Sequence, residues 1–99
     1  MSVNIHLSVY IEKLASPDEA DAVEAAVQRV LEEHGIESWM YVGAFHNPPW
    51  VKVCTEHGPM IIRGFAEWSP GFERDFTGAV RAIAPAADID LEWGFPDER

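Results

Sequence analysis

Residues 3–12 alternate between apolar and polar side chains without a break, and this alternation constrains the fold more than any other feature of the chain. Successive side chains of a β-strand point to opposite faces of a sheet, so the pattern predicts a strand with one buried face and one open face. The apolar set is Val3, Ile5, Leu7, Val9 and Ile11, and the polar set is Asn4, His6, Ser8, Tyr10 and Glu12.

Two Ser-Pro pairs mark the expected starts of two helices. Ser16 is followed by a proline and, three residues on, by Glu19, which is a capping-box pattern. Ser69 is also followed by a proline, and a stripe of apolar residues at helical spacing comes after it. The sequence therefore predicts one helix over Pro17–His34. It predicts a second helix that follows Ser69-Pro70 and ends by Pro85. The buried stripe of this second helix is Phe72, Phe76, Ala79, Val80 and Ile83.

Further strands are expected over Ile36–Phe45, Trp50–Cys54, Pro59–Trp68 and Ala87–Phe95. The resulting order is β-α-β-β-α-β with a short extra strand, Trp50–Cys54, in the middle. This order predicts an α+β fold on the ferredoxin-like split βαβ plan, with two helices on one face of an antiparallel sheet. The chain has 99 residues, so we expect a single domain over residues 1–99.

The charge is strongly acidic and lies in two blocks. The formal net charge is −10 at pH 7. Eight acids lie between Glu12 and Glu37 against two bases, and five lie from Asp88 to the end of the chain against Arg99. Phosphate backbones are bound by clustered Lys and Arg, so no nucleic-acid partner is expected. No apolar stretch is long enough to cross a membrane, and we expect a cytoplasmic protein with no membrane partner.

The open face of the predicted sheet would display several aromatic side chains beside acids. Exposed apolar patches of this kind mark interfaces or ligand sites. The residues expected to bind a partner are Tyr10, Trp39, Tyr41, Trp50, Phe65, Asp88, Asp90 and Glu92. The occupant can be a basic partner protein, a second copy in a homodimer, or a small molecule. For Trp50, which follows two prolines, burial in the core and a place in a rigid recognition loop both remain open.

An acid-base site on the same face is the alternative. His6 and Asp90 could be neighbours on adjacent strands, with Tyr10 two residues from His6 on the same side. A carboxylate that orients an imidazole, with a phenol nearby, is the minimum equipment for proton transfer. The arrangement depends on strand register, because a slip of one residue would move these side chains apart.

No metal site or cofactor is expected. Cys54 is the only cysteine, and Cys54 and His57 have C-x-x-H spacing, with His46 and His6 as further nitrogen donors. A structural zinc site needs four ligands, usually including several cysteines, so a turn histidine beside a half-buried cysteine is the simpler interpretation. The acids of the first helix, Asp18, Asp21, Glu24, Glu32 and Glu33, are expected to point to solvent, where they aid solubility or attract a basic protein.

These observations favour a small acidic protein-binding domain without enzymatic activity that docks on a basic partner. Bacterial immunity and antitoxin proteins, which cover the basic active site of a toxin enzyme, have this general character, although no motif assigns the chain to such a family. The alternative is a small cofactor-free enzyme, of the mono-oxygenase or isomerase type, on a dimeric ferredoxin-like scaffold.

Overall fold

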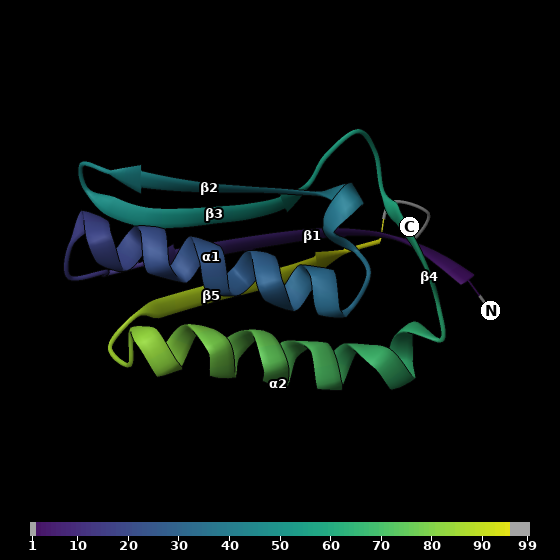
Figure 1. Ribbon diagram of the computed structural model, residues 1–99. Coiled ribbons are helices and arrows are strands. Elements are labelled where there is room, and N and C mark those ends of the chain that lie inside the picture. Colours follow the sequence, from purple (N-terminus) through teal and green to yellow (C-terminus); the bar gives the residue numbers. More distant parts are fainter. Residues whose placement is uncertain (1, 96–99) are drawn as a thin grey trace.

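The computed structural model describes residues 2–95, except the side chains of Ser2 and Val3. The acids Asp97 and Glu98, and Arg99, lie outside this part of the chain. The elements, in chain order, are β1 (Ser2–Glu12), α1 (Pro17–Glu33), the 3₁₀ turn η1 (Glu37–Trp39), β2 (Met40–His46), β3 (Pro49–Thr55), β4 (Met60–Arg63), α2 (Phe65–Ile83) and β5 (Asp88–Gly94). Figure 1 shows the two helices side by side against the sheet.

The long first strand is the centre of the sheet. Ser8 of β1 pairs with Cys54 of β3 on one side and with Glu92 of β5 on the other, and β2 pairs with the outer edge of β3. The resulting order β2-β3-β1-β5, antiparallel throughout, confirms the α+β class and follows the ferredoxin-like plan. The extra strand is β4, which pairs with residues 2–5 of β1. Trp50–Cys54, predicted as the extra strand, belongs instead to β3, a full member of the sheet.

The helices cover the face that carries the apolar side chains of β1. Ile5, Leu7, Val9 and Ile11 are fully buried, as the alternation predicts. They pack in one core with residues of both helices, among them Val23, Val27 and Leu31 of α1 and Phe72, Phe76 and Val80 of α2. The opposite face of the sheet carries the other set of side chains and is covered by neither helix.

The first helix begins as predicted. The Oγ of Ser16 accepts a hydrogen bond from the backbone N–H of Glu19 at 3.1 Å, and the Glu19 carboxylate accepts one from the Ala15 N–H at 3.0 Å. Pro17 occupies the first turn, where its missing N–H leaves no bond unmade. The helix ends at Glu33, one residue before the predicted end, and Gly35 follows with a φ of +70°.

The predicted start of the second helix at Ser69-Pro70 is wrong. The helix α2 begins at Phe65, after Gly64 in a left-handed conformation, and Pro70 lies inside it. The preceding strand is correspondingly short and ends at Arg63 rather than Trp68. The early start places Phe65, Trp68 and Phe72 at helical spacing, and all three rings contact Trp93 of β5. Burial of this cluster outweighs the one backbone hydrogen bond that a helical proline removes.

Glu24 of α1 was expected to point to solvent, but it contacts the sheet: its carboxylate accepts a hydrogen bond from the backbone N–H of Ala44 at 2.9 Å. Asp21 is exposed, as predicted, and its Oδ1 also lies 2.8 Å from Nε2 of His46. Strand β2 is an edge strand, and an unpaired edge N–H can bind another chain, so Glu24 protects this edge. No helix within residues 2–95 is both long enough and apolar enough to span a membrane.

Candidate functional site

The uncovered side of the sheet, here called the open face, is built by the second set of alternating side chains. Because paired residues share a face, the register places the side chains of all four long strands in rows. The rows are Tyr41, Gly43 and Phe45 on β2; Trp50, Lys52 and Cys54 on β3; His6, Ser8, Tyr10 and Glu12 on β1; and Asp88, Asp90, Glu92 and Gly94 on β5.

Four aromatic side chains on this face, Tyr10, Tyr41, Phe45 and Trp50, are named here the open-face aromatics. Trp50 lies between two of them: its ring stacks on Phe45 at a centroid distance of 4.6 Å and on Tyr10 at 6.1 Å. Tyr41 lies over Gly43, where its ring fills the place that a Cβ would take. Tyr10, Tyr41 and Phe45 each expose between 36% and 40% of their surface. The rings therefore support one another and still present area to a ligand.

The polar ends of the open-face aromatics are available for binding. The indole N–H of Trp50 and the hydroxyls of Tyr10 and Tyr41 form no hydrogen bond with any residue in the range 2–95. Tyr and Trp usually find a hydrogen-bond partner when they are buried. Tyr10 and Tyr41 are exposed, and the indole nitrogen of Trp50 is not a buried unpaired atom. A ligand on this face can therefore gain hydrogen bonds as well as apolar contact. Trp50 is half-buried, so it belongs to the face and is not a core residue.

Strand β5 and the end of β1 place carboxylates beside the aromatics. Asp88 and Glu12 are paired across the strands, as are Asp90 and Tyr10. We call Glu12, Asp88, Asp90 and Glu92 the acidic edge. Of these four acids, only Asp88 has an ion-pair partner within the described residues: its carboxylate lies 3.4 Å from Nζ of Lys13. Three carboxylates of the acidic edge are therefore uncompensated by a direct ion pair.

The predicted acid-base pair of His6 and Asp90 does not form. His6 lies opposite Gly94, and Asp90 lies opposite Tyr10, four residues further along β1. Four residues of strand span about 13 Å, which is beyond hydrogen-bond reach. The Nδ1 of His6 is hydrogen-bonded to Oγ1 of Thr55 at 3.0 Å instead. His6 also lines a shallow hollow of about 350 Å³ with Ser8 and Glu92.

Phe65, which was also predicted for the partner-binding surface, lies elsewhere. It is the first residue of α2 and packs against Trp93 at 5.0 Å, so it is not on the open face. Trp39 is 38% exposed and lies directly before β2, at the end of the β2–β3 pair that is remote from Trp50. Phe45 was not predicted as a binding residue, although it alternates with Tyr41 along the strand and this spacing could have identified it.

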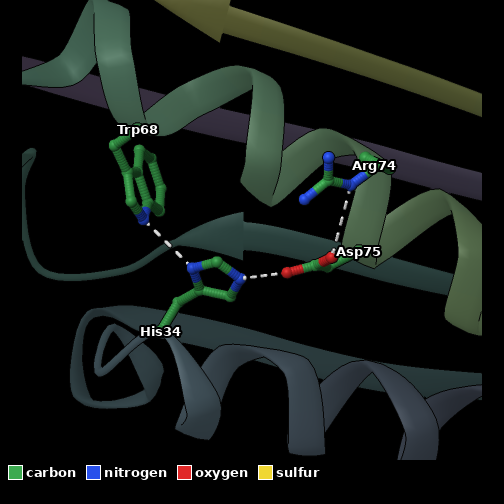
Figure 2. Close-up of polar contacts among 4 residues, drawn as sticks. All are labelled: His34, Trp68, Arg74 and Asp75. Atoms are coloured by element: carbon green, nitrogen blue, oxygen red, sulfur yellow. Dashed lines mark hydrogen bonds and ion pairs between the residues drawn. The ribbon is translucent and has the colours of Figure 1, made fainter.

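A histidine held by a carboxylate does exist, but it lies on the helix side of the sheet. Figure 2 shows His34, at the end of α1, between Trp68 and Asp75 of α2. The Trp68 indole donates to Nδ1 of His34 at 3.1 Å, so the proton of the neutral ring is on Nε2, which donates to Asp75 at 3.0 Å. Both ring nitrogens are occupied, so this arrangement joins the helices and offers no free base.

A hollow beside the open-face aromatics lies at the end of the sheet where β1 ends. It has a volume of about 390 Å³, and its walls come from the end of β1, the residues that follow it and the β2–β3 turn. Tyr10 and Trp50 form one wall and Pro48 and Pro49 another, with Glu12 and Lys13 at the same hollow. Pro48 and Pro49 therefore contribute to a concave surface, and Asn47-Pro48 connects the two strands.

No group of three or more His, Cys, Asp or Glu side chains in residues 2–95 could hold a metal ion. Cys54 is half-buried on the open face, and His57 lies in the following turn, 3.6 Å from Glu56. Comparison of the chain with models of protein families, with curated proteins and with solved structures found no match.

Proposed function

We propose that this protein is a binding domain without enzymatic activity and that its open face docks on a basic partner protein. The observation that carries the proposal is the row of open-face aromatics with unpartnered polar ends beside the acidic edge. Aromatic side chains provide large contact area at interfaces, and Trp and Tyr are enriched among the residues that dominate binding energy. The fold positions them on a rigid sheet, so little conformational entropy is lost when they bind.

Charge favours a basic partner over a second copy of the chain. Each copy has a formal net charge of −10, so two copies repel one another at long range. Glu12, Asp90 and Glu92 have no ion-pair partner within the described residues and can attract Lys or Arg of another protein. Complementary charge raises the association rate and selects the partner, while the aromatics supply most of the affinity.

An inhibitor of the immunity or antitoxin type is the narrower form of this proposal. Such a protein must cover a basic active site, and the acidic edge beside an apolar strip provides the two kinds of contact that this task needs. This narrower assignment rests on the class of surface alone.

The proposal is tested by titration calorimetry with a short synthetic peptide rich in arginine and leucine, at low and at high salt. The double variant D90N/E92Q neutralises the acidic edge, and E32Q/E33Q removes the same charge from the exposed end of α1. We expect D90N/E92Q to weaken binding about fivefold at low salt, since two exposed charge contacts contribute roughly 0.5 kcal/mol each. We expect E32Q/E33Q to change the affinity by less than about twofold.

Equal loss of peptide affinity in the two double variants would contradict the proposal, because it would mean that binding depends on the net charge of the protein and not on the open face. Light scattering on the protein alone is the second measurement. A monomer is expected, and a stable dimer that is broken by Phe45→Ala would show that a second copy occupies the face instead.

A further inference from the structure

The hollow of about 390 Å³ at the end of the open face has a composition that suits one kind of side chain. One wall is aromatic, formed by Tyr10 and Trp50, whose ring planes are inclined by only 26°. A second wall is apolar and stiff, formed by Pro48 of the β2–β3 turn and by Pro49, the first residue of β3. A carboxylate, Glu12, lies at the same hollow. Aromatic faces, an apolar wall and a carboxylate together are the features that bind a cation with an aliphatic stem.

The charges around the hollow favour a cation. Glu12 has no ion-pair partner among the described residues, whereas Lys13 has its charge compensated by Asp88 at 3.4 Å. Tyr10 is paired across the strands with Asp90 on one side and with Lys52 on the other. Around the aromatic wall the carboxylates of Glu12, Asp88 and Asp90 therefore still outnumber the cations of Lys13 and Lys52. A cation over the face of Trp or Tyr gains attraction from the ring quadrupole, and a nearby carboxylate adds to it.

The geometry favours a guanidinium group over an ammonium group. The guanidinium is planar and weakly hydrated, so it stacks on an aromatic face and can donate two hydrogen bonds to one carboxylate. A compact ammonium group keeps its hydration shell more strongly and has no flat face to stack. The proline wall can contact the aliphatic stem of an arginine, which carries apolar surface along its length.

We propose that this hollow, the Tyr10–Trp50 pocket, binds an arginine side chain of the basic partner. The guanidinium stacks on the aromatic wall and donates to Glu12, and the stem lies against Pro48 and Pro49. This inference rests on the proposed function, since it names the partner residue that anchors the open face.

The test uses N-acetyl-L-arginine methylamide as the probe, with the matched lysine and citrulline compounds as controls. Citrulline keeps the size and the planar end group of arginine but has no charge. Chemical-shift mapping on ¹⁵N-labelled protein is expected to show saturable shifts of the Trp50 indole N–H and the Glu12 amide. We expect the lysine compound to bind at least about threefold more weakly than arginine, and the citrulline compound about tenfold more weakly.

Glu12→Gln and Glu32→Gln form a matched pair, because both residues are exposed and each substitution removes one negative charge. Glu12→Gln is expected to weaken arginine binding at least about threefold, and Glu32→Gln to leave it unchanged within experimental error. Neither substitution removes a buried contact, so both variants are expected to fold; thermal unfolding checks this. Equal binding of arginine and citrulline compounds, or shifts confined to the hollow near His6, would overturn the proposal.

The outcomes separate this inference from the proposed function. If the arginine compound leaves the pocket unshifted while D90N/E92Q still weakens the basic peptide selectively, the pocket assignment is wrong and docking on the open face stands. If the arginine compound binds at the pocket but the peptide is insensitive to the acidic edge, the pocket is a small-molecule cation site and the docking proposal is wrong.

Discussion

The molecule has two clusters of aromatic side chains, one on each side of the sheet, and they differ in how their polar atoms are satisfied. On the helix side, the Trp68 indole donates to His34 and the Trp93 indole donates to Glu73 at 2.9 Å. On the open face, the indole of Trp50 and the hydroxyl of Tyr10 have no partner within residues 2–95. The same residue types thus close a core on one side and leave a surface able to bind on the other.

The comparison shows that ring stacking alone does not identify a structural cluster. Trp50 and Phe45 stack at 4.6 Å, closer than the 4.9 Å between Trp68 and Phe72, yet Phe45 is 40% exposed and Phe72 is fully buried. The two clusters differ in whether the indole N–H and hydroxyl groups of their rings donate a hydrogen bond to an acceptor inside the protein.

The largest difference is expected between Phe72→Ala and Phe45→Ala. Phe72 is fully buried, and its truncation should cost about 3–5 kcal/mol of unfolding free energy, because a cavity is left in the core. Phe45 is 40% exposed, and its truncation should cost about 1 kcal/mol or less. Urea unfolding followed by circular dichroism measures both. Equal losses of unfolding free energy would mean that Phe45 supports the core as strongly as Phe72, which would contradict its place on an exposed face.

Trp93→Phe and Trp50→Phe make the same chemical change on the two sides. Both remove an indole and keep an aromatic ring, but only Trp93 loses a hydrogen bond, the one to Glu73. We expect Trp93→Phe to cost about 1–2 kcal/mol more than Trp50→Phe, since it leaves a partly buried acceptor without its donor. The unfolding free energies of the two variants measure this difference. A smaller loss of stability for Trp93→Phe than for Trp50→Phe would mean that the hydrogen bond from Trp93 to Glu73 does not stabilise the helix side.

Gly43→Ala is expected to move Tyr41 without disturbing the helix side. The added methyl group would occupy the space of the Tyr41 ring, which is exposed and can swing away. The stability loss should be below about 1 kcal/mol, because only the end of an exposed side chain must shift. Gly78, on the exposed side of α2 with open space at its Cβ, is the control, and Gly78→Ala should be stabilising by about 0.5–1 kcal/mol. Tyr41 ring resonances and unfolding curves report the two effects; unchanged Tyr41 resonances would contradict the placement of its ring.

The smallest effect on stability is expected for Lys13→Gln. Lys13 and Asp88 are 75% and 70% exposed, so their ion pair contributes at most about 0.5 kcal/mol. Removing this cation from the Tyr10–Trp50 pocket should nevertheless tighten binding of the arginine compound by about twofold, because it frees Asp88. The titration described for the pocket measures this, and weaker binding in Lys13→Gln would show that Lys13 helps to hold the ligand.

Local patterns predicted much of this fold, and long-range geometry decided the rest. The alternation along β1 and the cap at Ser16 depend only on neighbouring residues, and both predictions are confirmed. The start of α2 was missed because the Ser69-Pro70 signal is local, whereas Phe65 and Trp68 become helical through packing on Trp93. The helical spacing of Phe65, Trp68 and Phe72 was the signal that could have corrected it.

The candidate site shows the same limit. The sequence correctly placed Tyr10, Tyr41 and Asp90 on one face of the sheet, because side-chain parity is set within each strand. It placed His6 near Asp90 incorrectly, because register depends on how two distant segments pair. The Tyr10–Trp50 pocket could not be predicted, because its walls come from segments almost forty residues apart.

If a basic partner docks on the open face, the Trp50 indole must be accessible in the free protein, whereas the Trp68 and Trp93 indoles are hydrogen-bonded inside it. Hydrogen exchange of the tryptophan indole N–H groups, with and without the arginine-rich peptide, measures this difference. We expect slow exchange for Trp68 and Trp93 under both conditions, and fast exchange for Trp50 that slows when the peptide is saturating. Protection of Trp50 in the free protein, or fast exchange that saturating peptide leaves unchanged, would contradict docking on the open face.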